Sequence, residues 1–386
     1  MRKYFEFYSG VKIKCGESAL MTIGTELGNL GCKRPLLLSS TSAEKLGATE
    51  KVRAAIPADT VEEIVCLTNI PARFDADMVG EIKKSFLSKN CDGIIAVGGD
   101  GVMDTAKCLK LFLAQECDEI IPLLECASSK GNKVPLIAIP TENGSGKEAS
   151  GMLEIGEHYT KTDAIIPEVV IIDEDTAMAA PSRAVAGLGV YALANAIEAY
   201  IAAEEGDPAE LYAENAIRLL SRHLVNAVKD GENEEACRAT ALAGTMGGIA
   251  YGNLPFGAAH ALAEGMADVT GEPIEEMFMI TLVPAMRRAR EDFNDRLKNI
   301  LFYVAGATEY AETPDSERSK RAIAVVEELL EKIKEISRIQ TKISKTKIMR
   351  ESFGAIAESA ANNRAAITAL KPLSKEDFIA LLNDAY

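Results

Sequence analysis

A glycine-rich turn carries the residues best suited by type and spacing to bind a phosphate. It reads Gly98-Gly99-Asp100-Gly101 and follows a short apolar run, Gly93 to Val97. The next residues, Asp104 to Lys107, begin a segment of good helix formers, so the pattern predicts a strand, a tight turn and a helix. Unpaired N–H groups at the start of a helix attract phosphate, and glycines let the backbone approach it. The turn is therefore a candidate nucleotide site; the alternative is a sharp turn that binds nothing.

A second loop, residues 140–150, follows another apolar run, residues 135–139. It carries Thr141, Asn143 and Ser145 among glycines. Hydroxyl and amide groups at the carboxyl end of a buried strand are suited to a bound nucleotide or substrate. A surface hairpin is the alternative for this loop alone. Two such loops after neighbouring strands support a nucleotide site more strongly than either loop does alone.

Strands and helices are expected to alternate through the first half of the chain. Short apolar runs predict strands at residues 4–8, 11–13, 35–39, 63–66, 93–97, 135–139 and 168–172. Helical patterns fall at residues 18–27, 42–56, 75–89 and 102–115. This alternation predicts an α/β fold with a parallel sheet covered on both faces.

The pattern changes after Pro181, where apolar residues recur with helical spacing and strand-like runs disappear. Helices are expected at residues 183–203, 206–230, 234–250, 258–268, 275–306, 314–337, 347–361 and 374–384. Pro181 and Ser182 supply a proline and an N-cap where these helices begin. We therefore expect an α/β dinucleotide-binding domain over residues 1–181 and an all-helical domain over residues 182–386.

Composition limits the classes of partner. The net charge of −16 over 386 residues argues against a surface for nucleic acid or for an anionic membrane. We find no uncharged apolar stretch of about 18 residues and no apolar signal core near the start, so a cytoplasmic protein is expected. The eight cysteines are scattered without a Cys-x-x-Cys pair. They are expected to be reduced core residues.

Both loops resemble motifs of the iron-containing (group III) alcohol dehydrogenase family. Residues 98–107 are similar to the family's GGGSxxDxAK, and residues 140–148 to its PTTxGTGSE. Residues 170–173 with Pro181 match the segment that leads into the helical domain, and residues 196–200 are similar to HAIEAY. The resemblance implies a Rossmann-like domain followed by a helical domain, as in the dehydroquinate synthase-like architecture. It also implies NAD or NADP, a small alcohol or aldehyde as substrate, a cleft between the domains, and often a homodimer.

The resemblance assigns cofactor contacts to particular residues. Gly98, Gly99 and Gly101 would lie against the pyrophosphate, with Thr141 and Ser145 near the adenine and ribose; Asp104 and Asn143 complete the expected set. Asp100 replaces a glycine of the motif, and its carboxylate would repel a pyrophosphate unless it turns towards a hydroxyl or towards Lys147. Ser40 stands where many members carry an aspartate that opposes a 2′-phosphate. NADP is therefore expected to be at least as acceptable as NAD.

Most of the family's metal ligands are replaced. The resemblance places the ligand positions at Tyr191, Asn195, His260 and Glu275, and a further family histidine at Glu264. Only His260 is retained. Neutral tyrosine and asparagine oxygens are poor ligands for a transition metal, so we expect no catalytic iron or zinc.

These replacements leave three interpretations of the protein's function. A metal-free site would polarise a carbonyl through Tyr191 or protonated His260, with Glu264 setting the charge of His260. Alternatively, His260, Glu264 and Glu275 would form an oxygen-rich site for Mg²⁺ or Mn²⁺. The third is a nucleotide-binding protein, or an enzyme of another reaction type, that has lost the dehydrogenase site. The turn at residues 98–101 also resembles the GGDG turn of lipid and NAD kinases, although residues 104–107 and 140–148 favour the dehydrogenase-like fold.

Overall fold

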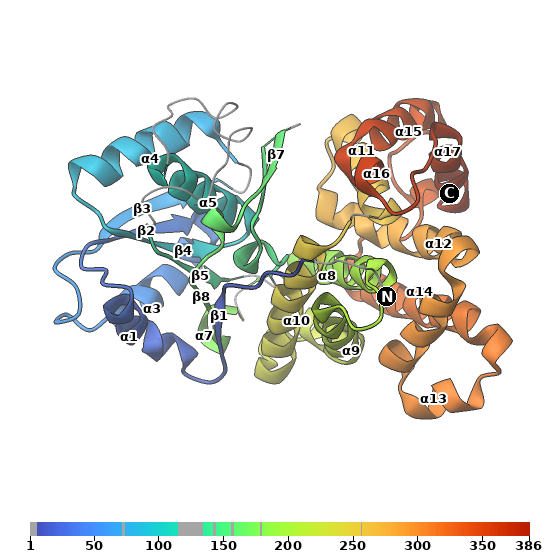
Figure 1. Ribbon diagram of the computed structural model, residues 1–386, viewed down its shortest axis with the longest axis horizontal. Coiled ribbons are helices and arrows are strands. Elements are labelled where there is room, and N and C mark those ends of the chain that lie inside the picture. The colour runs from blue at the N-terminus through green and yellow to red at the C-terminus, as the bar shows by residue number, and fades with distance from the viewer. Residues whose placement is uncertain are drawn as a thin grey trace. The chain divides into compact units, whose positions relative to one another are not determined.

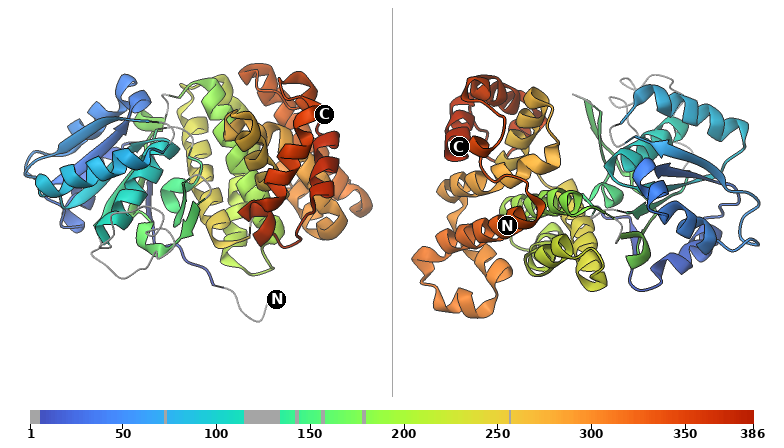
Figure 2. Two further views of the ribbon diagram at one scale, coloured as in Figure 1. Left: turned by 90° about the horizontal axis from the view of Figure 1, so that it is seen from above. Right: turned by 180° about the vertical axis from the view of Figure 1, so that it is seen from behind.

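The computed structural model describes residues 6–71, 74–114, 134–141, 144–155, 158–177, 180–255 and 257–386 (Figures 1 and 2). Two compact units make up the chain, one of residues 8–180 and one of residues 181–386. Glu6 and Phe7 group with the second unit. The Phe7 ring stacks on Tyr212 of that unit, with 5.8 Å between ring centroids. Asn143 and Phe256 lie outside the described residues.

The first unit is built on a six-stranded sheet in the order β1-β8-β5-β4-β2-β3. All its strand pairs are parallel, which confirms the predicted α/β fold class. The strands are β1 Lys12–Cys15, β2 Pro35–Ser40, β3 Val65–Ile70, β4 Gly93–Gly98, β5 Leu136–Pro140 and β8 Val169–Ile172. Central strands β2, β4, β5 and β8 are buried along their length, because helices cover both faces of a parallel sheet.

Helices lie on both sides of this sheet (Figure 1). On one face, α1 (Ile23–Asn29) and α3 (Ala48–Ala55) share a core with alternate sheet residues such as Leu37, Ile95 and Ile137. On the other lie α4 (Ala76–Ser88) and α5 (Asp100–Ala114). Two further short helices are α2 (Thr41–Lys45) and α7 (Glu174–Ala177).

Several boundaries in this unit differ from the predicted ones. The helix expected at residues 42–56 is split into α2 and α3 by Gly47, whose φ of 76° is left-handed. The strand expected at residues 4–8 is wrong over residues 6–8, and α5 begins at Asp100 instead of Val102. An antiparallel hairpin of β6 (Met152–Ile155) and β7 (His158–Lys161) was not expected.

The second unit is helical in its described residues. Its helices are α8 Ser182–Ala202, α9 Pro208–Lys229, α10 Glu234–Asn253, α11 Ala258–Thr270, α12 Ile274–Ala305, α13 Ala307–Glu312, α14 Arg318–Ser337, α15 Phe353–Asn362, α16 Arg364–Thr368 and α17 Lys375–Asp384. By length and composition α8 is apolar enough to cross a membrane, but 83% of its most apolar window is buried inside the protein. Burial in the core of the unit accounts for this apolar character.

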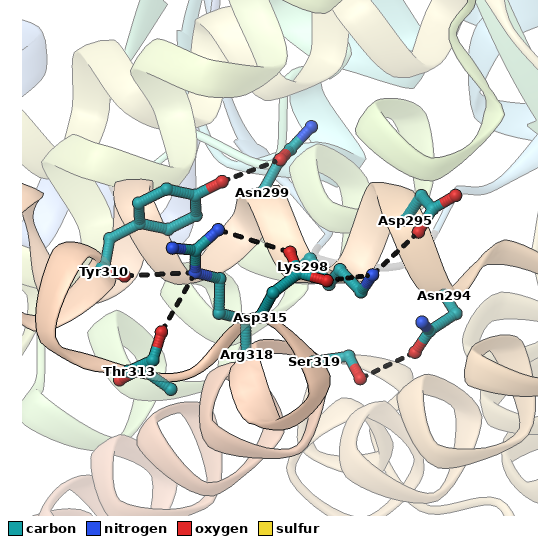
Figure 3. A network of polar contacts seen from close by, with 9 residues as sticks. All are labelled: Asn294, Asp295, Lys298, Asn299, Tyr310, Thr313, Asp315, Arg318 and Ser319. Atoms are coloured by element: carbon teal, nitrogen blue, oxygen red, sulfur yellow. Dashed lines mark hydrogen bonds and ion pairs between the residues drawn. The ribbon is translucent and has the colours of Figure 1, made fainter.

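A polar network ties α12 to the segment that follows it (Figure 3). Lys298 lies 2.7 Å from Asp315 and 3.1 Å from Asp295. Arg318 donates to the carbonyl oxygens of Tyr310 and Thr313. These contacts hold the turn between α13 and α14 against α12, where the sequence predicted only a gap between two helices.

Candidate functional site

The two glycine loops meet at one edge of the sheet. In the β4–β5 register Gly98 is opposite Pro140, and the N–H of Thr141 donates to the Gly98 carbonyl at 3.4 Å. Gly98 has a φ of +151°, and a Cβ there would lie 2.9 Å from Val102 and 3.0 Å from the Ser40 hydroxyl. Position 98 therefore requires glycine, and the close packing brings Ser40 to the start of α5. Gly99 and Asp100 remain partly exposed at the first turn of that helix.

Asp100 turns towards both partners that the sequence analysis named. Its Oδ1 accepts from the Ser145 hydroxyl at 2.5 Å, and its Oδ2 lies 3.8 Å from the Lys147 ammonium. Lys147 also donates to Asp104 at 2.7 Å. Ser145 and Lys147 belong to the second loop, whereas Asp100 and Asp104 belong to α5. These contacts therefore join the two loops, and the charge of Asp100 is partly neutralised.

Behind this contact, Asp104 and Lys107 are buried charged groups. Burial raises the pKa of the Asp104 carboxyl, against the attraction of Lys147 and Lys107. Burial also lowers the pKa of Lys107 to about 8. The Lys107 ammonium donates to the Met152 carbonyl at 2.9 Å. The sequence indicates Lys107 only as the last residue of the motif at residues 98–107, whereas the structure shows it fully buried on α5.

Ser40 has a structural role beside its expected one. Its hydroxyl accepts from the Ala43 N–H at 3.0 Å and so caps α2. The structure thus brings Ser40, Gly98, Asp100, Asp104, Thr141 and Ser145 to one edge of the sheet, together with Gly99 and Gly101 in the turn. Their contact with a cofactor stays a prediction, as does that of Asn143.

The second unit contains a buried polar cluster around His260. The His260 Nδ1 lies 2.5 Å from a Glu198 oxygen, and its Nε2 lies 2.7 Å from the Asn195 side-chain oxygen. Glu198 also accepts from the N–H groups of Ala259, at 2.6 Å, and Gly257, at 3.1 Å. One carboxylate therefore holds both the N-terminus of α11 and the histidine that α11 carries.

Three aromatic rings enclose the histidine. Ring centroids of Tyr251, Phe278 and Tyr191 lie 4.2, 4.7 and 5.6 Å from that of His260. Only 1% of His260 is exposed, whereas Tyr191 is partly exposed. The structure brings Tyr191, Asn195 and His260 together as expected, but the roles assigned to Tyr191, His260 and Glu264 stay predictions.

Glu198 is the residue of this cluster that sequence reasoning missed. The sequence places Glu198 only within the motif at residues 196–200 and predicts Glu264 as the carboxylate beside His260. The spacing from Asn195 to Glu198 on α8 places both on one helix face, which was the available signal.

This arrangement of side chains is poorly suited to bind a metal ion. Both ring nitrogens of His260 face hydrogen-bond partners, and Tyr191 and Asn195 offer neutral oxygens. Within the described ranges, no group of three or more His, Cys, Asp or Glu side chains is placed to hold a metal ion.

Comparison with known proteins matches both halves of the chain to one family. Residues 10–174 match the model for iron-containing alcohol dehydrogenase, and residues 185–386 match the model for the C-terminal domain of that family. NAD-dependent methanol dehydrogenase of Bacillus methanolicus is 29% identical over 260 residues, which are 66% of this chain and 68% of that protein. Choline dehydrogenase of Bacillus subtilis is 28% identical over 281 residues, 70% of this chain and 69% of that protein.

Solved structures share the fold along the whole chain. A 1,3-propanediol oxidoreductase superposes with a TM-score of 0.89 at 22% identity and covers 100% of both chains. Sulfoacetaldehyde reductase from Bifidobacterium kashiwanohense, solved in complex with NAD⁺, has a TM-score of 0.83 at 18% identity and covers 100% of this chain and 99% of its own.

Proposed function

The chain belongs to the iron-containing alcohol dehydrogenase family, and from this premise we propose that it transfers hydride between NAD or NADP and a small alcohol or aldehyde. The observation that carries the proposal is the pair of linked glycine loops at the ends of β4 and β5. The methanol dehydrogenase relative is named NAD-dependent, and the sulfoacetaldehyde reductase structure contains NAD⁺, which supports the choice of cofactor.

The loop residues fit a dinucleotide. The main chain at Gly98 to Gly101 carries no bulky apolar side chain, and the first N–H groups of α5 suit a pyrophosphate. Ser40, next to Gly98, adds no negative charge to oppose a 2′-phosphate, so NADP is as acceptable as NAD. A bound dinucleotide would supply the hydride chemistry, and the chain would bind and orient it.

The residues of the second unit do not fit the family's metal, so we assign carbonyl polarisation to a side chain. Tyr191 is the most exposed of the three aromatic residues around His260. Its hydroxyl can donate a hydrogen bond. In the proposed reaction its O–H donates to the substrate oxygen as negative charge develops there. His260, held by Glu198 and Asn195, positions the Tyr191 ring. The role predicted for Glu264, setting the charge of His260, stays a prediction.

The remaining properties follow from the family and the charge. We propose a cytoplasmic homodimer that acts on a small molecule and has no nucleic-acid or membrane partner. The net charge of −16 supports the absence of nucleic-acid and anionic-membrane partners. Light scattering of the purified protein measures the oligomeric state.

Cofactor binding and turnover test the proposal together. NADH and NADPH should change fluorescence on titration into the protein, and short aldehydes should then consume the bound cofactor in the presence of EDTA. Tyr191→Phe should lower kcat by about a hundredfold with unchanged cofactor affinity. Binding without turnover of any aldehyde or alcohol would favour the nucleotide-binding protein instead, and absence of binding would reject both.

A further inference from the structure

Three charged residues depart from the family motifs in the loops themselves; Asp100 and Lys147 belong to the described residues, and Glu142, at the second threonine of PTTxGTGSE, does not. Against GGGSxxDxAK, Asp100 stands at the third glycine, and against PTTxGTGSE, Lys147 stands at the serine. The two positions lie on different elements, 47 residues apart in sequence, and the structure brings the two charged groups to 3.8 Å. The two replacements are opposite in charge.

Lys147 is shared between two carboxylates. Its ammonium donates to Asp104 at 2.7 Å and faces Asp100 on the other side. The Asp104 side chain is 7% exposed, whereas those of Asp100 and Lys147 are 23% and 20% exposed. The second Asp104 oxygen, Oδ1, has no hydrogen-bond partner among the residues that the structure describes. Removal of Lys147 would therefore remove the cation that faces both carboxylates at the first turns of α5 and leave Asp104 offset by the buried Lys107.

These carboxylates lie at the end of the helix that would receive the pyrophosphate. Asp100 is the first residue of α5, and its carboxylate is fixed by the Ser145 hydroxyl at 2.5 Å. An anion at the α5 N-terminus is attracted by the N–H groups and repelled by Asp100 and Asp104. The balance of these effects depends on the cation that faces both carboxylates.

We propose that Asp100 and Lys147 are a compensating pair, in which Lys147 neutralises the phosphate loop and makes dinucleotide binding possible despite Asp100. Lys147 is thus a positioning residue of the cofactor site. Ser145 completes the link, because its hydroxyl donates to Oδ1 of Asp100 while the Lys147 ammonium faces Oδ2. This inference rests on the proposed function, since the ligand is the dinucleotide of the proposed reaction.

A double-mutant cycle tests the pair through cofactor affinity. Kd values for NADH and NADPH are measured by fluorescence titration for the wild type, Lys147→Ser, Asp100→Gly and the double variant, which restores the family's residues at these two positions. Lys147→Ser should weaken binding by about tenfold or more, and the double variant should bind within about threefold of the wild type. Asp100→Gly alone should bind as tightly as the wild type or more tightly.

Further variants separate charge from a structural effect. Lys147→Arg keeps the charge and should bind within about threefold of the wild type. The loss of cofactor affinity in Lys147→Ser should become smaller as the KCl concentration is raised, because the Asp100 and Lys147 side chains are both partly exposed. Lys84→Ser is the matched control, since Lys84 also forms a 2.8 Å ion pair but lies on the surface of α4. If Lys147→Ser does not fold, Lys147→Gln takes its place in the cycle.

The outcomes distinguish this inference from the proposed function. Equal losses in Lys147→Ser and in the double variant would show that Lys147 acts independently of Asp100 and would overturn the pair. Wild-type affinity in Lys147→Ser would overturn it as well, while the oxidoreductase proposal stands. A wild type that binds neither NADH nor NADPH rejects the proposed function and this inference together.

Discussion

Ser40 combines a local structural role with the choice of cofactor. Its hydroxyl caps α2, and aspartate is as good an N-cap as serine, so Ser40→Asp should fold normally. The added carboxylate would oppose a 2′-phosphate beside Gly98. We expect NADPH binding to weaken relative to NADH by about 1–2 kcal/mol, roughly five- to thirtyfold. Ser40→Asn, a neutral N-cap, should keep the wild-type preference. A wild type that already binds NADH tenfold more tightly than NADPH would contradict the role given to Ser40.

Lys107 should make stability depend on pH at alkaline values. Burial lowers its pKa to about 8 from an ordinary value of 10.5. Between these values the unfolded chain holds more protons than the folded one, so stability rises with pH across this range. Below about pH 8 both states are protonated and the full cost of the buried charge is present.

Lys107→Met removes that cost. The free energy of unfolding of the wild type minus that of Lys107→Met should therefore increase by about 2 kcal/mol between pH 7 and pH 10. Urea unfolding at the two pH values measures it, with Lys84→Met on the surface as the control that should show no change. A difference that stays flat or falls with pH would mean that Lys107 titrates normally.

The sequence anticipated contacts between neighbouring motifs better than contacts between distant helices. The orientation of Asp100 towards a hydroxyl and Lys147 could be predicted, because both loops follow adjacent strands and a carboxylate near phosphate needs compensation. The pairing of Glu198 with His260 could not be predicted in the same way. It joins residues 62 positions apart and depends on how α8 and α11 pack.

At the scale of elements, Glu198 joins α8 to α11. Glu198→Ala would leave the N–H groups of Gly257 and Ala259 and the His260 Nδ1 without their acceptor in a buried site. We expect a loss of about 3 kcal/mol in the free energy of unfolding, measured by urea titration. Glu276→Ala breaks the more exposed pair with Arg183, between α12 and α8, and should cost less than about 1 kcal/mol. Equal losses in the two variants would deny Glu198 this role.

Strand positions show why the sheet was predicted well in its centre and poorly at its margin. The central strands are continuous apolar runs, because both of their faces are covered. β3 pairs only with β2 at the edge of the sheet, so it tolerates Thr68 and Asn69, and the predicted strand ended too early at residue 66. The β6–β7 hairpin has strands of four residues, too short for their alternation to stand out.

At the scale of the whole molecule, the resemblance predicts a retained cofactor site in the first unit and a replaced metal site in the second. The first unit keeps the glycine loops, and in our proposal Lys147 compensates for Asp100. In the second unit, hydrogen-bond partners and aromatic rings surround His260, the one histidine at the ligand positions that the resemblance predicts. Conservation of a fold at a TM-score of 0.89 is compatible with this difference, because packing fixes the fold while ligand identity fixes the metal.

Metal content is the measurement that decides between a retained and a replaced catalytic centre. Catalytic zinc sites ordinarily use three protein ligands, whereas the four positions that the resemblance predicts as ligands carry one imidazole and one carboxylate, His260 and Glu275. We expect protein dialysed against EDTA, then offered Fe²⁺, Zn²⁺, Mn²⁺ or Mg²⁺ and desalted, to retain well below one ion per chain by elemental analysis, and its turnover to survive chelation. Glu264 is the residue that would complete a metal site as its third ligand. About one bound ion per chain, lost in His260→Ala and in Glu264→Gln, would restore the metal-dependent mechanism and remove the polarising role from Tyr191.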